Sequence, residues 1–200
     1  MIEKIVTGEF QTNTYVISNQ GKCILVDPGL DFKRSAERIK EKYEIQAILL
    51  THGHIDHIDG IRFFNVPIYI HEAELPFLND SSLSLYRMLG LTQPFSSAQF
   101  KIIPLKDGME FELIGYKFKV YHTPGHTKGS VIYAYHRKLL SGDTLFHMSM
   151  GRTDFPTGDA SKMRNSLKRI MDTFEDSIEV YPGHDEKTTI GFERKHNPYL

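Results

Sequence analysis

The stretch THGHIDH, residues 51–57, places three histidines and one aspartate within seven positions. His52 and His54 are two positions apart, so in an extended chain both side chains point to the same side and can bind one metal ion together. If a helix begins near Asp56, the side chains of Asp56 and His57 diverge from that pair and can face a second ion. One short segment can therefore serve two ions about 3.5–4 Å apart, a separation at which they share a bridging water.

Metal-binding side chains follow a predicted strand at four places in the chain. An almost unbroken apolar segment, residues 45–50, leads into the stretch above, and three later strands each end at a turn with such a side chain. The additional candidates are His126, Asp143 and His184, which lie in the segments HTPGH, SGD and PGHD. Imidazole and carboxylate ligands without a thiolate suit zinc, iron or manganese. We expect these side chains to complete the two metal sites.

Composition argues against several classes of protein. The 200 residues carry 24 Lys and Arg against 25 Asp and Glu, a net charge of −1, whereas a nucleic-acid-binding protein usually has a basic excess. Cys23 is the only cysteine, so no disulfide can form within the chain. No apolar run approaches the ~20 residues of a membrane span, and the first residues lack a signal-peptide pattern. We therefore expect a cytoplasmic protein with one domain over residues 1–200 and no membrane or nucleic-acid partner; its oligomeric state is left open.

The order of predicted elements indicates an α/β fold. Strands are predicted over residues 2–6, 14–18, 22–27, 45–50, 109–113, 116–121, 131–135, 139–141 and 178–181. Amphipathic helices are predicted over residues 31–43 and 159–174, and short helices with loops over residues 72–100. A strand, a helix and a second apolar strand in succession predict a βαβ crossover inside a sandwich.

The motifs THGHIDH, HTPGH, SGDTLF and PGHD occur here in the order that defines the metallo-β-lactamase superfamily, and the whole chain resembles that superfamily. The resemblance implies a four-layered αβ/βα sandwich with a metal site at the edge where the two sheets meet. It implies two groups of metal ligands and one bridging residue: His52, His54 and His126 for the first ion, Asp56, His57 and His184 for the second, and Asp143 between them.

Within the superfamily the chain most resembles the glyoxalase II group and its short relatives. The supporting segments are SGDTLF, the following GRTD and the ending NPYL. Hydroxyacylglutathione hydrolases of that group carry a C-terminal helical domain with basic residues that grip glutathione, and we expect no such domain after His184. The resemblance thus implies a single metallo-β-lactamase-like hydrolase domain over residues 1–200 without a dedicated glutathione site.

The function that follows is hydrolysis of a small thioester or related ester by a binuclear centre that activates a bridging hydroxide. Two divalent ions are expected, zinc first, with iron or manganese as alternatives. Asp56 is expected to orient the hydroxide as well as to bind metal, and no side-chain nucleophile is required. The alternative is a persulfide dioxygenase with one iron held by His52, His126 and Asp143. A phosphodiesterase or nuclease is disfavoured by the net charge, and lactone or β-lactam hydrolysis shares the same chemistry.

Three other residues carry weaker expectations. Arg152 is a candidate for binding an anionic part of the substrate, and an ion pair with Asp154 or Asp159 is the equal alternative. Asp27 is expected to be a turn residue, with second-sphere support to a ligand histidine as a lesser alternative. His122 is expected to brace the turn of its motif rather than to bind metal.

Overall fold

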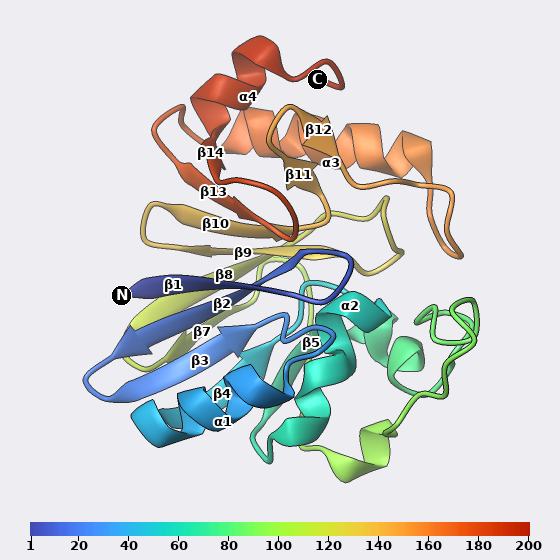
Figure 1. Cartoon of the computed structure of the whole chain (residues 1–200). Helices are drawn as coiled ribbons and strands as arrows, with labels where there is room; N and C mark the ends of the chain where they lie inside the picture. Colours follow the sequence, from blue (N-terminus) through green and yellow to red (C-terminus); the bar gives the residue numbers. More distant parts are fainter.

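Two β-sheets pack face to face and helices cover both outer faces, so the chain forms four layers (Figure 1). The computed structural model describes residues 1–200. The first sheet has the strand order β1-β2-β3-β4-β5-β6, with bounds Ile2–Thr7, Thr12–Asn19, Lys22–Val26, Glu44–Leu49, Ile68–His71 and Ile102–Leu105. The second has the order β14-β13-β10-β9-β8-β7, with bounds Thr188–Thr189, Glu179–Pro182, Lys138–Gly142, Val131–Tyr135, Tyr116–His122 and Glu110–Leu113. This architecture confirms the predicted αβ/βα sandwich.

The helices divide between the two outer faces, the early ones on the first sheet and the late ones on the second (Figure 1). The early helices are α1, α2 and the 3₁₀ helices η1, η2 and η3, with bounds Lys33–Lys42, Ile55–Ile58, Asp59–Phe63, Glu72–Leu78 and Ser97–Gln99. The late helices are α3, Ala160–Thr173, and α4, Ile190–His196. A small hairpin pairs β11, Leu145–Phe146, with β12, Ser149–Met150. No helix is both long and apolar enough to span a bilayer.

Alternation along the central strands separates three hydrophobic clusters. In β3, Cys23 and Leu25 belong to the cluster beneath α1, whereas Ile24 and Val26 belong to the cluster between the two sheets. In β9, Ile132 joins the cluster beneath α3. Because both faces of each sheet are covered, the central strands appear in the sequence as continuous apolar runs.

The predicted strands and both long helices are present, with boundaries shifted by one or two residues. Parallel pairing of β3 with β4 around α1 confirms the βαβ crossover. The sequence did not predict β5, β6, β11, β12, β14 or α4. The reason is clearest for β6, which contains Pro104: proline cannot donate a ladder hydrogen bond and is tolerated in this edge strand, but it weakens the strand pattern.

Strand ends from the two sheets meet at one edge of the sandwich. The backbone N–H of Val131 in β9 donates to the carbonyl of Thr51, just after β4 (2.9 Å). The N–H of Asn13 in β2 likewise donates to the carbonyl of Gly183, just after β13 (2.7 Å). Backbone hydrogen bonds therefore join the sheets at the points where the metal-binding motifs begin.

Candidate metal centre

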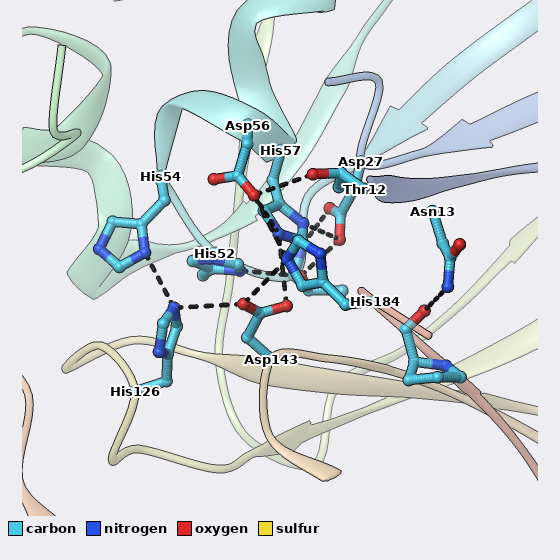
Figure 2. Close-up of polar contacts among 12 residues, drawn as sticks. Thr12, Asn13, Asp27, His52, His54, Asp56, His57, His126, Asp143 and His184 are labelled. Atoms are coloured by element: carbon cyan, nitrogen blue, oxygen red, sulfur yellow. Dashed lines mark hydrogen bonds and ion pairs between the residues drawn. The ribbon is translucent and has the colours of Figure 1, made fainter. Parts of the chain in front are cut away.

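Seven side chains from four segments meet at this edge of the sandwich (Figure 2). They are the sequence candidates His52, His54, Asp56, His57, His126, Asp143 and His184. Their ligand atoms form two groups, each with all atoms within 4.8 Å of one another: His52, His54 and His126 in one, Asp56, His57 and His184 in the other. The Asp143 carboxylate lies between the groups, with Oδ2 3.6 Å from His126 Nε2 and Oδ1 3.3 Å from His57 Nε2.

The backbone around the first motif separates its ligands as the sequence predicts. His54 is extended (φ −76°, ψ 149°) and is the residue immediately before α2. Asp56 and His57 lie inside α2, so their side chains leave the chain in a different direction from that of His54. The helix that was expected near Asp56 is therefore present, and it directs one motif toward both groups.

Hydrogen bonds fix the orientation of the histidine rings. In four of the five rings Nδ1 contacts a neighbouring oxygen: Thr51 Oγ1 for His52 (3.1 Å), Asp27 Oδ2 for His57 (3.0 Å), Arg152 O for His126 (2.7 Å) and Phe10 O for His184 (3.0 Å). His54 is the exception, because its Nδ1 faces His126 Nε2 at 2.9 Å. A partner on one ring nitrogen selects the tautomer that leaves the other nitrogen available to a metal.

The cluster contains buried polar atoms without a hydrogen-bond partner. These atoms are His52 Nε2 and His54 Nε2, together with His57 Nε2 and Asp143 Oδ1, which lie 3.3 Å apart but do not form a hydrogen bond. An unsatisfied buried polar atom costs about 1–3 kcal/mol, so four in one cluster require an explanation. Nitrogen and carboxylate oxygen are the donors that divalent transition metals take, and the donor set therefore fits metal ions.

Electrostatics in the cluster favour a cation. Burial lowers the pKa of His52 and His54 well below its usual value, so both rings are neutral and offer a lone pair. Burial also acts on His57 and His184, but the adjacent carboxylates outweigh it and raise the pKa of His57 well above its usual value and that of His184 to about 10. The pKa of Asp143 is well below its usual value, because these two histidines outweigh the effect of burial. A metal that binds here meets an ionised carboxylate and displaces protons from the two histidines.

Asp27 is more than the turn residue that we expected. It does adopt a left-handed conformation (φ +51°) after β3. Its buried carboxylate also accepts hydrogen bonds from the backbone N–H of Thr51 (2.8 Å) and the hydroxyl of Thr51 (2.6 Å), and it contacts His57 Nδ1. The structure therefore shows the lesser of the two alternatives, support to a ligand histidine: Asp27 orients His57 and also ends the strand.

Glu74 in η2 is a residue that the sequence analysis missed. Its fully buried carboxylate accepts the backbone N–H of Gly53 through Oε2 and that of Gly129 through Oε1, both at 2.8 Å. Gly53 separates His52 from His54, and Gly129 lies in the loop that carries His126. One carboxylate thus joins the two loops of the first group. No local pattern marks it, because its partners lie 21 and 55 positions away.

Gly183 is required by close packing against the cluster. A Cβ at this position would overlap Asp143 Oδ1 and would lie 2.8 Å from Cε1 of His57. The glycine before His184 therefore allows the Asp143 carboxylate to approach both groups.

Arg152 and His122 lie beside the cluster. The Arg152 guanidinium forms two contacts of 2.6 Å with the carboxylate of Asp154, which is one of the two partners considered from the sequence. His122 contacts the carbonyl of Lys128 through Nε2 (2.9 Å) and stacks on His71, with the ring centres 4.2 Å apart. His122 thus braces the turn as expected, and its stacking partner comes from the other sheet.

Comparison with known proteins agrees with this geometry. Residues 7–184 match the family model of the metallo-beta-lactamase superfamily. The chain belongs to the metallo-beta-lactamase superfamily. Among curated members of the superfamily, the hydroxyacylglutathione hydrolase GloC of Haemophilus influenzae is 33% identical over 207 residues, covering 100% of this chain and 97% of that protein. The probable metallo-hydrolase YqgX of Bacillus subtilis is 32% identical over 204 residues, covering 98% and 96%.

Solved structures of superfamily members share the whole architecture. The BLEG-1 B3 metallo-beta-lactamase superposes with a TM-score of 0.91 at 36% identity, covering 100% of this chain and 99% of that one. TTHA1623 in a di-iron-bound form superposes with a TM-score of 0.85 at 34% identity, covering 99% and 100%. ETHE1 from Myxococcus xanthus superposes with a TM-score of 0.78 at 27% identity, covering 99% of this chain and 83% of that one.

Proposed function

We propose that this protein is a metal-dependent hydrolase with two divalent ions, and that it cleaves small thioesters or related esters. The observation that carries the proposal is the position of Asp143 between two complete groups of ligand atoms. The names of the relatives support a hydrolase, since one is called a hydroxyacylglutathione hydrolase and another a probable metallo-hydrolase.

Each candidate ligand has an assigned role in the proposed centre. We assign the first ion to His52, His54 and His126, the second to Asp56, His57 and His184, and the bridge to Asp143. When bound, two divalent ions polarise the carbonyl of the substrate and lower the pKa of a water to about 7. Zinc suits this donor set, and iron and manganese also do; the di-iron form of TTHA1623 supports iron in particular.

Asp56 is proposed to have a second role. Its Oδ2 accepts a hydrogen bond from the hydroxyl of Thr12 (2.9 Å), and its carboxylate borders the cavity above the cluster. A carboxylate held in this way can orient the attacking water toward the substrate carbonyl. Arg152 borders the same cavity and is proposed to contact the substrate. A thiolate leaving group needs little protonation, because a thiol has a pKa near 8.5.

We propose that the whole chain, residues 1–200, acts as one hydrolase domain on a small-molecule substrate in the cytoplasm, without a nucleic-acid or membrane partner. The near-neutral charge supports this view, because phosphate-backbone substrates are usually held by a basic surface.

Elemental analysis of protein purified without added metal tests the proposal. We expect about two ions per chain, and we expect His54→Ala to lose metal and thioesterase activity together. His136→Ala, in the exposed turn between β9 and β10, is the matched control and should keep both. A metal-free protein with full thioesterase activity would contradict the proposal. One iron per chain with oxygen uptake on glutathione persulfide would instead favour the dioxygenase.

A further inference from the structure

A cavity of about 420 Å³ lies above the metal cluster and is lined by two kinds of side chain. Candidate ligands line it, among them Asp56, Asp143 and His184. Apolar side chains line it as well, and those that we call the apolar wall are Phe10, Met88, Leu89, Phe146, Met150 and Phe155. The volume is within the range of small-molecule sites, roughly 300–1,000 Å³. A molecule whose reacting group faces the metals must therefore place the rest of itself against apolar side chains.

Several of these apolar side chains are exposed to solvent. Met88 is 58% exposed and its neighbour Leu89 37%, and Phe10, from a distant part of the chain, is 46% exposed. Large apolar side chains that gather around one cavity commonly mark a binding surface. The gathering at the metal centre indicates that their burial is completed by a substrate.

The segment that carries Met88 and Leu89 is anchored to the metal-binding helix α2 and to the residue that follows it. The N–H of Ile55, the first residue of α2, donates to the carbonyl of Ser84 (2.9 Å). The buried hydroxyl of Tyr86 donates to Asp59 Oδ1 (2.7 Å), just after that helix. Between these two anchors, Leu85 adopts a left-handed conformation (φ +71°), which is strained for a branched side chain. The segment that carries Met88 is thus held in a defined place beside the centre.

Fixed positive charge is scarce around the cavity. Arg152 is the only Lys or Arg among the lining residues. Its guanidinium is already paired with Asp154 and lies over the ring of Phe155, 3.9 Å from the ring centre. Asp185 adds a carboxylate at the rim. The lining therefore offers no unpaired Lys or Arg to a strongly anionic thiol carrier, whereas a neutral apolar group needs no such partner.

We infer that the substrate is an uncharged thioester with an apolar acyl chain, which packs against the wall of Phe10, Met88, Leu89, Phe146, Met150 and Phe155. This inference rests on the proposed thioesterase function and specifies its substrate class. The acyl carbonyl lies toward the metal cluster, and the alkyl chain extends along the apolar wall.

A chain-length series of N-acetylcysteamine thioesters tests the inference with the metal-loaded protein. Burial of each methylene is expected to raise kcat/KM up to about fourfold, so hexanoyl should exceed acetyl by at least roughly tenfold. S-lactoylglutathione, which is anionic and has a polar acyl group, should fall below hexanoyl. Equal rates along the series, or a preference for S-lactoylglutathione, would overturn the inference and leave the thioesterase function intact.

A double variant and a matched control test whether the apolar wall causes the preference for longer acyl chains. Met88→Ser together with Leu89→Ser should lower the hexanoyl rate by a larger factor than the acetyl rate, so that the hexanoyl-to-acetyl ratio of kcat/KM falls at least roughly fivefold. Leu91→Ser is the matched control, because Leu91 is exposed in the same segment but does not line this cavity. A selective loss in the control, or none in the double variant, would contradict the assignment.

A binding measurement separates the substrate class from the reaction. If no thioester is hydrolysed by protein that carries its metals, the proposed function fails. Calorimetry with the thioethers S-hexyl- and S-ethyl-N-acetylcysteamine then tests, independently of any reaction, whether the apolar wall binds an alkyl chain. Binding of the hexyl compound at least roughly tenfold tighter supports the apolar wall, and equal binding overturns it.

Discussion

Replacing Glu74 by Gln should weaken metal binding without unfolding the protein. The carboxylate accepts one backbone N–H from the loop of His52 and His54 and another from the loop of His126. A glutamine offers one carbonyl oxygen and one amide NH₂, so one of the two N–H groups must face another donor. The two loops of the first ligand group are then no longer held together.

The effect of Glu74→Gln on stability is the sum of two opposing terms. Burial raises the pKa of Glu74 from its usual 4.5 to about 7. For an acid with a raised pKa, the corresponding stability of roughly 3 kcal/mol is present below about pH 4.5 and is lost as the pH rises through 7. Glutamine avoids this cost of burying a charge, but its amide NH₂ faces one of the two backbone N–H groups and leaves that buried donor unsatisfied, which costs about 1–3 kcal/mol. At about pH 8 we therefore expect the free energy of unfolding to change by about 1 kcal/mol or less.

Metal affinity should respond much more strongly than stability. Loss of a partner that positions ligands typically lowers metal affinity about 10- to 100-fold. Competition for Zn²⁺ with a chromophoric chelator measures the affinity, and urea unfolding of the metal-free protein measures the stability. The difference in metal affinity between wild type and Glu74→Gln should become smaller at about pH 6, because the Glu74 carboxyl of the wild type is then itself protonated.

Glu72→Gln is the matched control, because Glu72 lies in the same helix with its side chain 49% exposed and paired with Lys106. It should bind metal as the wild type does. Equal metal affinity in Glu74→Gln and wild type at about pH 8 would refute the reasoning. A fall in affinity that merely follows a large loss of unfolding free energy would refute it as well.

Three further changes have definite expected outcomes. Gly183→Ala places a methyl group against Asp143, so the affinity for Zn²⁺ in chelator competition should fall about tenfold or more while circular dichroism stays native. Burial and the neighbouring His122 lower the pKa of His71 from 6.5 to about 4. A base with a lowered pKa lowers the free energy of unfolding as the pH falls from about 6.5 to 4. Over that range the wild type should therefore lose up to about 3 kcal/mol more free energy of unfolding than His71→Asn in urea titrations. Cys23→Ala should keep full metal content and hydrolysis and lose about 1 kcal/mol in unfolding free energy, because this thiol is buried beneath α1; loss of activity would indicate a catalytic thiol.

Local patterns explain why so much of the fold was predictable. Strands such as residues 131–135 are recognisable because their side chains are apolar on both faces, and helix α3 because its apolar stripe recurs at helical spacing after the capping residue Asp159. Strand β6 was missed because Pro104 interrupts its strand pattern. Pairing with the neighbouring strand β5 holds these residues in the sheet, and the sequence pattern does not reveal that pairing.

The sequence by itself determined the family, the sandwich and the seven candidate ligands. Each of the four motifs begins within two residues of the end of a strand, and such spacing is encoded locally. Only the tertiary structure decided how these motifs are held and what lies above them. Asp27 and Glu74 act on partners far away in the chain, and the apolar wall joins Phe10 to Met88 and Phe155. These relations depend on which chain segments the packed sheets bring together, and no spacing in the sequence records that.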